Sequence, residues 1–312
     1  MTSAGQVDLH RRRGARAGYD YAAACARNIG WVTEEEQARL RARRVAIAGL
    51  GGVGGSHLLT LARLGIARFN LAEFDHFELS NFNRQVGATL SNVGRPKLDV
   101  LVEMAKDINP ELDVRVFPHG VAPENVAEFL RDADIYVDGL DYFAFDARAV
   151  TFEACARHGV PATTAAPLGM GVALLNFLPG RMSFEQYFGF AGQPPAERAL
   201  RFLLGLSPAV LQQNYLVDHS TVNFVEQRGP STVIACQLCA GVAAAETLKI
   251  LLKRGPVTSA PWGLHFDAYR NRYKRTWRPW GHRNPLQWLA RAIARRRLAV
   301  GTSASKLRAA AN

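Results

Sequence analysis

A glycine run and two acids near the start of the chain have the residue types and spacing of a nucleotide site. Gly49, Gly51, Gly52 and Gly54 belong to a Gly-Leu-Gly-Gly-Val-Gly segment that contains the pattern G-x-G-x-x-G. The first glycine allows a tight turn, the second lets backbone approach a phosphate, and the third lets a helix pack on a strand. The pattern predicts phosphate binding where a strand precedes it and a helix follows it.

Two acids follow the glycines at a spacing that suits ribose recognition. Glu73 and Asp75 lie 19 and 21 residues past Gly54, at the end of the next expected strand. An acid at this place holds ribose hydroxyls in dinucleotide-binding folds. On these residues alone, an NAD-dependent Rossmann oxidoreductase fits as well as any other nucleotide-binding protein.

The elements that must position these residues alternate between strands and helices. We expect strands at 45–48, 67–74, 114–117, 135–138 and 160–164, and helices at 33–43, 56–64, 96–108, 123–130 and 145–158. Thr33 and Glu36 form a capping box for the first helix, and Pro123 is expected at the first position of the fourth. This alternation predicts an α/β fold with a Rossmann-like, doubly wound, mainly parallel sheet.

The pattern changes after residue 164. A strand at 170–177 is expected to continue the sheet in a more antiparallel C-terminal half. Residues 181–229 are expected to form a long irregular insertion, and such segments are usually functional or mobile. A buried helix at 232–252 and a strand at 264–269 follow, while residues 1–18 are expected to be a flexible N-terminus.

The net charge of +11 is concentrated at the C-terminus. Residues 270–312 contain twelve Lys or Arg side chains and no acid, so residues 1–269 are close to neutral. We interpret 270–312 as a basic tail, in which Tyr269, Tyr273, Trp277 and Trp280 lie among or beside arginines. Nucleic acid is therefore a possible partner only through this tail; a solvated basic extension is the simpler interpretation.

Targeting signals and cysteines suggest a soluble, cytoplasmic protein. The N-terminus has no apolar signal core, and Pro and Gly interrupt the longest uncharged stretch, 159–180, so no membrane association is expected. Cys236 and Cys239 form a C-x-x-C without a second pair, inside an apolar run. We interpret them as buried thiols and expect no structural zinc.

The segment after the second strand separates the possible functions. It contains Leu-Ala-Glu-Phe-Asp (71–75), Ser-Asn-Phe-Asn-Arg-Gln (80–85) and Gly-Arg-Pro-Lys (94–97). In order and spacing these motifs resemble those of the ThiF/MoeB/HesA family, bacterial relatives of ubiquitin-activating enzymes. Asp138-Gly-Leu-Asp141 and Arg27-Asn-Ile-Gly30 resemble further motifs of that family. The resemblance covers residues 19–180 and 231–252.

The resemblance implies an adenylyltransferase that activates a carboxylate with ATP and Mg²⁺. Arg84 and Lys97 are suited to stabilise charge on the phosphate oxygens and on departing pyrophosphate, and Asp141 to hold Mg²⁺. The family's N-terminal arginine, which Arg27 resembles, is passed into the neighbouring subunit's site, which implies a homodimer. The residues expected to bind the nucleotide are Gly49, Gly51, Gly52, Gly54, Glu73, Asp75, Asn81, Arg84 and Lys97. The resulting ThiF-like adenylation domain spans 19–269, with a nucleotide-binding half at 44–165 and a crossover or substrate region at 166–231.

The sequence departs from the family pattern at three places. Glu73 stands where the family usually has Asp, and Tyr142 where Asn commonly follows the second aspartate. Because no cysteine lies between Cys155 and Cys236, we expect adenylation without an obligatory enzyme thioester.

The family's natural substrate is the C-terminal glycine of a small ubiquitin-like or sulfur-carrier protein. A small carboxylate on a modified tRNA nucleoside, as in the dehydratase relatives, is the alternative within the family. An NAD-dependent oxidoreductase would explain the glycines and the acid but leave Asn81, Arg84, Lys97 and Asp141 unexplained. A catalytically silent relative that keeps the fold as a binding platform would have no use for these charged residues.

Overall fold

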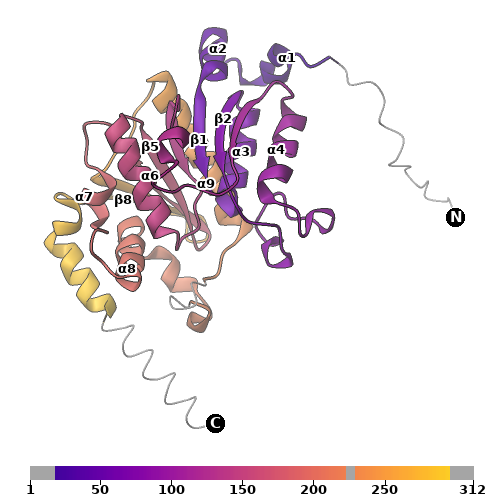
Figure 1. Ribbon diagram of the computed structural model, residues 1–312. Helices are drawn as coiled ribbons and strands as arrows, with labels where there is room; N and C mark the ends of the chain where they lie inside the picture. The colour runs from indigo at the N-terminus through magenta and orange to yellow at the C-terminus, as the bar shows by residue number, and fades with distance from the viewer. Residues whose placement is uncertain (1–17, 223–228, 296–312) are drawn as a thin grey trace.

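The computed structural model describes residues 18–222 and 229–295, and the expected flexible N-terminus falls outside it except for Gly18. One mixed sheet runs through this part of the chain in the order β3-β2-β1-β4-β5-β6-β7-β8 (Figure 1). Its strands are β1 Arg44–Ala48, β2 Arg68–Ala72, β3 Asp113–Phe117, β4 Ile135–Asp138, β5 Ala162–Leu168, β6 Gly171–Phe177, β7 Trp262–Asp267 and β8 Arg272–Trp277.

The sheet confirms the predicted fold class. Strands β3, β2, β1, β4 and β5 pair in parallel, and β6, β7 and β8 continue the sheet in antiparallel fashion. All five residues of β1 are buried because helices cover both faces of the sheet. The carboxyl ends of the parallel strands meet at one edge, where ligands bind in such folds.

Helices form two layers around the sheet. The helices are α1 Tyr21–Cys25, α2 Glu34–Ala42, α3 Gly52–Arg63, α4 Lys97–Ile108, α5 Val126–Phe129, α6 Phe145–His158, α7 Phe184–Phe188, α8 Pro195–Leu206 and α9 Val233–Leu252. Helices α2, α3, α4 and α9 pack over one face, and α5, α6, α7 and α8 over the other. The capping box of Thr33 and Glu36 is present at the start of α2, as predicted.

Three helix predictions differ from the structure. Helix α3 begins at Gly52 rather than 56, because the glycines themselves form its first turn. Helix α5 begins at Val126, so Pro123 lies in the preceding turn and not at the first helical position. The expected irregular insertion at 181–229 contains α7 and α8; Pro195 occupies the first position of α8, where a missing N–H costs nothing.

The basic stretch after residue 269 is folded in its first part. Residues 272–277 form β8, the outer strand of the sheet, and residues 285–295 are helical. Arg295 of this last helix pairs with Glu197 of α8 at 2.8 Å, which attaches it to the domain. Residues 270–295 are therefore not the free extension that the charge pattern suggested.

Helix α9 is the one helix in the described ranges that is long and apolar enough to cross a membrane. Helices in protein cores have the same length and composition, and α9 packs on β4, β5, β6 and α3. Its two cysteines, Cys236 and Cys239, are buried in this contact.

Candidate active site

The glycine turn between β1 and α3 is so tight that side chains have no room. Gly49 has φ of +80°, a conformation that favours glycine, and a Cβ on Gly54 would lie 1.8 Å from the Gly49 carbonyl oxygen. A Cβ on Gly52 would lie 2.9 Å from the sulfur of Cys236. The first turn of α3 is thus bare backbone, and such a turn directs N–H groups toward an anion.

Glu73 fastens this turn to the end of β2. One carboxylate oxygen accepts a hydrogen bond from the Leu50 N–H at 2.7 Å. The other accepts from the N–H groups of Phe74 and Asp75 at 2.8 and 3.0 Å. Both oxygens of this buried carboxylate are engaged with backbone, so Glu73 braces the loop. Asp75, whose side chain is 53% exposed, is the acid that faces open space.

A cavity of about 290 Å³ lies beside Asp75, lined by Phe74, Asp75, His76, Glu78, Asn81 and Lys97. It brings together three of the residues that the sequence predicted for the nucleotide, namely Asp75, Asn81 and Lys97. The Lys97 ammonium is 3.1 Å from the Asp75 carboxylate, and its side chain is only 7% exposed. A buried cation at the wall of a polar cavity suits an anionic ligand.

Backbone bonds explain why residues 22 positions apart meet here. The Lys97 N–H donates to the Asp75 carbonyl at 2.9 Å, and the Phe77 N–H donates to the Arg95 carbonyl at 3.0 Å. These bonds close the chain between β2 and α4 into a loop whose two ends lie side by side. Lys97, the first residue of α4, therefore faces the end of β2.

Arg84 and Gln85 approach the glycine turn from this closed loop. The Cγ and Cδ atoms of Arg84 lie 3.5 and 3.7 Å from where a Gly52 Cβ would stand. Its guanidinium donates to the Ser80 carbonyl and the Asn83 side chain, both at 2.9 Å, and no carboxylate of the described residues pairs with it. The Gln85 Oε1 atom is buried and has no hydrogen-bond partner in this part of the chain, as expected of a polar group that awaits a ligand or water.

Asp141 lies in the loop between β4 and α6. Its side chain is exposed, and one carboxylate oxygen accepts from the Phe143 N–H at 3.0 Å. Because β4 pairs with β1, the loop begins beside the glycine turn; Gly139 is so close to Gly49 that neither position has room for a Cβ. Among the residues that the structure describes, no hydrogen bond is recorded for the other carboxylate oxygen of Asp141.

Arg148 of α6 holds the Asp141 loop in place through its side chain, and the sequence did not lead us to predict this role. Its guanidinium pairs with Asp138 at 2.9 Å and donates to the carbonyls of Leu140, Asp141 and Tyr142 at 2.8, 2.9 and 3.2 Å. Both side chains of the ion pair are 2% exposed. The sequence holds a signal for it, because an arginine spaced between Phe145 and Phe152 on the buried face of α6 requires a partner.

Tyr142 connects the same loop to the crossover region. Its hydroxyl donates to the Ala199 carbonyl of α8 at 2.7 Å, and Arg148 lies over the Phe202 ring at 4.6 Å. The residue that departs from the family pattern is therefore a partly buried contact with the segment that follows β6.

Arg27 is the one predicted catalytic residue that the structure places far from the others. It lies in the 3₁₀ turn Ala26–Asn28, and the neighbouring Asn28 donates to the Leu64 carbonyl at the C-terminal end of α3. The glycine turn is at the other end of this helix, about 18 Å away at 1.5 Å per residue. In Figure 1, α1 lies at the top of the molecule and α8 at the bottom, near the site edge.

The cysteines near the site are buried. Burial raises the pKa of Cys155, Cys236 and Cys239, although Arg84 acts in the opposite direction on Cys236. Their thiolates are therefore disfavoured at neutral pH. In the residues that the structure describes, no group of three or more His, Cys, Asp or Glu side chains is arranged to hold a metal ion.

Comparison with known proteins identifies the family. The ThiF family model matches residues 25–289. Protein HesA of Leptolyngbya boryana is 35% identical over 148 residues, which cover 47% of this chain and 53% of HesA. The sulfur carrier protein adenylyltransferase of Thermus thermophilus is 38% identical over 112 residues, covering 36% of this chain and 41% of that protein. The chain spans about half the length of the curated relatives it matches.

Solved structures share the fold. The E. coli tRNA N6-threonylcarbamoyladenosine dehydratase TcdA superposes with a TM-score of 0.55 at 22% identity, over 74% of this chain and 95% of TcdA. E. coli MccB, solved with ATP, superposes with a TM-score of 0.58 at 21% identity, over 80% of this chain and 67% of MccB. At these identities the likeness establishes the fold.

Proposed function

The chain belongs to the ThiF family, and on this premise we propose that it is an ATP-dependent adenylyltransferase that activates a carboxylate. One observation carries the proposal. Lys97, which is buried, lies with Asp75 and Asn81 in a polar cavity, while the stem of Arg84 lies against Gly52 at the bare N-terminus of α3. An oxidoreductase that binds NAD needs the glycines and an acid, but it has no use for these two cations.

The proposed reaction joins a carboxylate oxygen to the α-phosphorus of ATP. The bond between the α-phosphorus and the bridging oxygen of pyrophosphate breaks, and its electron pair leaves with pyrophosphate. Negative charge grows on the phosphate oxygens and on the leaving group, where Arg84 and Lys97 would stabilise it. Lys97 exchanges its bond to Asp75 for one to phosphate, and Asp75 is then available for a ribose hydroxyl.

Asp141 is the residue we propose to hold Mg²⁺. The exposed carboxylate fits a cation that is usually bound by one or two protein carboxylates together with phosphate oxygens. The metal ion would offset charge on the triphosphate. Arg148 and Asp138 would hold the Asp141 carbonyl, and hence its carboxylate, at the edge of the sheet.

For the substrate we propose the C-terminal glycine carboxylate of a small ubiquitin-like or sulfur-carrier protein. The identity to the sulfur carrier protein adenylyltransferase supports this choice. The alternative is a small carboxylate on a modified tRNA nucleoside, which the common fold with TcdA supports. The crossover region 166–231 adjoins the Asp141 loop through Tyr142 and α8, and it would grip either substrate.

We propose further that no enzyme thioester is obligatory and that the active form is a homodimer. Burial raises the pKa of Cys155, Cys236 and Cys239, which suits inert thiols. Arg27 cannot reach the glycine turn of its own chain, so a role for it requires a second subunit. Exposed Ile29 and Trp31 beside Arg27 offer an apolar contact for that subunit.

The test is ATP–pyrophosphate exchange in the presence of candidate carboxylates. We expect exchange with a carrier protein that ends in glycine, and a loss of about 30-fold or more for Arg84→Ala and Asp141→Ala. Arg95→Ala is the matched control, since Arg95 is an exposed cation of the same loop that pairs with Glu103. Exchange stimulated by tRNA and not by carrier proteins would establish the alternative substrate. NAD binding without any exchange would overturn the proposal.

A further inference from the structure

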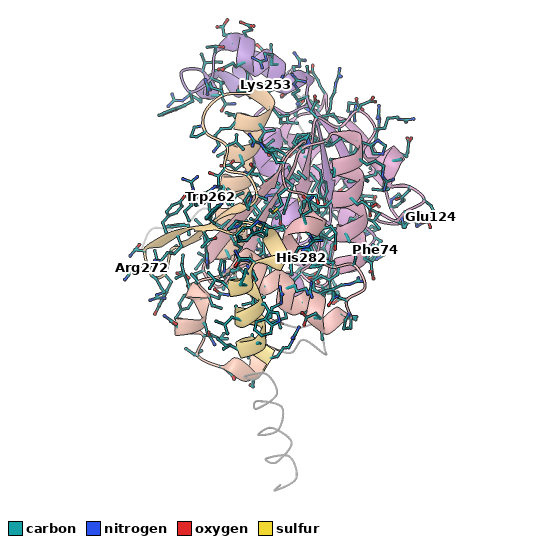
Figure 2. The ribbon with its side chains drawn as sticks, turned by 90° about the vertical axis from the view of Figure 1, so that its left-hand side faces the viewer. Phe74, Glu124, Lys253, Trp262, Arg272 and His282 are labelled. Carbon is teal, nitrogen blue, oxygen red and sulfur yellow. The ribbon has the colours of Figure 1, made fainter. Side chains whose placement is uncertain are left out.

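The outer end of the sheet presents aromatic and cationic side chains that the proposed reaction does not use. In the β7–β8 hairpin, Trp262 pairs with Trp277, Leu264 with Arg275, and Phe266 with Tyr273. Because side chains alternate along a strand, Trp262, Tyr273, Arg275 and Trp277 lie on one face. We call these four residues the platform. Figure 2 shows Trp262 and Arg272 at the side of the molecule away from Phe74, which lines the nucleotide cavity.

The platform is uncovered because the helix layer ends before it. Helix α9 packs on β4, β5 and β6, and β8 is the last strand of the sheet. Tyr273 and Trp277 are consequently 61% and 58% exposed. Exposed large aromatic side chains grouped on one strand indicate an interaction surface.

The platform side chains are already arranged in a stack. The rings of Trp262 and Trp277 lie 5.9 Å apart with an angle of 29° between their planes. The Arg275 guanidinium lies 4.2 Å from the centre of the Trp262 ring. A planar cation and two near-parallel indoles present flat surfaces on which an unpaired base can stack.

The charge around the platform selects an anionic partner. No acid occurs between Asp267 and the end of the sequence. Arg272 and Lys274, on the other face of β8, are exposed and form no ion pair within the described ranges. Arg275 on the platform and these two cations on the other face of the same edge strand surround the aromatic side chains with positive charge, which matches the phosphates of one strand.

We infer that the platform binds single-stranded nucleic acid, with bases stacked on Trp277 and Tyr273 and phosphates near Arg272 and Lys274. A duplex offers the platform no free base face, because its bases are already stacked on one another. An anionic membrane fits less well, because the aliphatic side chain on this face, Leu264, is partly buried in the sheet and leaves little surface to insert. This inference does not rest on the proposed adenylation, whose cavity lies elsewhere in the molecule.

The test is fluorescence anisotropy of the full chain with short oligouridine, oligothymidine and a duplex RNA, beside co-sedimentation with phosphatidylserine–phosphatidylcholine vesicles. We expect binding to the single strands, and the two oligonucleotides separate RNA from DNA as the source. Trp277→Ala and Tyr273→Ala each weaken this binding by about ten-fold. Arg272→Gln with Lys274→Gln lowers the slope of log affinity against log salt by about 0.7 for each phosphate that is no longer neutralised.

Matched controls exclude other sources of binding. Trp288→Ala removes an exposed indole elsewhere on the surface and leaves affinity unchanged. A second control replaces Arg296, Arg297, Lys306 and Arg308, which lie outside the described residues, with glutamine. In this background Tyr273→Ala is still expected to weaken binding to the single strands. Unchanged affinity in Trp277→Ala and Tyr273→Ala, binding to duplex or vesicles alone, or no binding at all would each overturn the inference. Circular dichroism of each variant verifies the fold.

Discussion

Asp138 and Arg148 form a buried ion pair at 2.9 Å directly beneath the loop that carries Asp141. Asp138 ends β4, and its carboxylate also accepts from the Tyr136 hydroxyl and the Leu140 N–H, both at 3.2 Å. Arg148 reaches from α6 to the pair and to three loop carbonyls. The pair therefore determines where the loop leaves the sheet, and with it the place of the proposed Mg²⁺ ligand.

Replacing Arg148 tests this supporting role. Arg148→Met leaves the Asp138 carboxylate buried without its cation and is expected to lower the free energy of unfolding by about 3–5 kcal/mol. Arg148→Lys retains the charge but not the planar fork that bonds Asp138 and the carbonyls together, so we expect a folded protein with slower exchange. Denaturant unfolding and exchange assays measure the two effects. Arg157→Met, an exposed cation of the same helix, is the control.

Two glycines of the turn between β1 and α3 are expected to respond differently to substitution, because backbone crowds one and a side chain crowds the other. A Cβ at position 54 would meet backbone at 1.8 Å, whereas one at position 52 would meet the Cys236 sulfur at 2.9 Å. Gly54→Ala is expected to abolish ATP binding whatever else is changed. Gly52→Ala is expected to cost about 1–3 kcal/mol of stability, and adding Cys236→Ala is expected to restore it. Calorimetric titration with ATP and thermal unfolding check both; equal rescue at the two positions would contradict the interpretation.

Complementation between subunits tests whether Arg27 acts in the neighbouring site. Arg27→Ala and Asp141→Ala are each expected to be inactive as homodimers. In a mixed dimer, one of the two sites has both an intact Asp141 and an intact Arg27 from the other subunit. Random mixing of the two variants makes about half of the dimers mixed, so we expect about one quarter of wild-type activity to return. Co-expression with two affinity tags allows the mixed dimer to be purified and assayed. No recovery in a verified mixed dimer would show that Arg27 does not act across subunits.

His57 makes stability depend on pH. It lies on α3, and neither ring nitrogen has a hydrogen-bond partner among the described residues. Burial lowers its pKa to about 4, although Asp138 acts in the opposite direction. The unfolded chain, with a pKa near 6.5, therefore binds a proton first as pH falls. This stability is fully present above about pH 6.5 and is lost between about 6.5 and 4.

Replacing His57 with Leu is expected to remove this loss of stability at acid pH. The slope of the unfolding free energy against pH is then expected to fall by up to about 1.4 kcal/mol per pH unit. Denaturant unfolding at several pH values between about 7 and 4 measures the slope. His158→Asn removes an exposed histidine of α6 and is expected to leave the slope unchanged. An unchanged slope in the His57 variant would show that another group governs acid unfolding.

The sequence by itself determined the order of elements from the helix at 33–43 to the strand at 170–177, the mainly parallel sheet with its antiparallel continuation, and the family. These features depend on signals within a few residues of one another: the glycines after β1, the capping box of Thr33 and Glu36, and the motif around Asn81 and Arg84. Such local signals are readable because turns, caps and the alternation of apolar residues arise from neighbouring side chains. The helices α7 and α8 were not predicted from the sequence, because proline and glycine separate them in an aromatic-rich segment.

Only the tertiary structure decided which distant residues meet. The contact between Lys97 and Asp75 depends on the backbone bonds that close the loop between them. The burial of Arg148, the distance of Arg27 from the glycine turn and the place of β8 at the edge of the sheet likewise follow from how the elements pack. Side-chain type alone leaves these outcomes open, because the same arginine is a solvated charge, a buried brace or part of a stacking surface according to what lies against it.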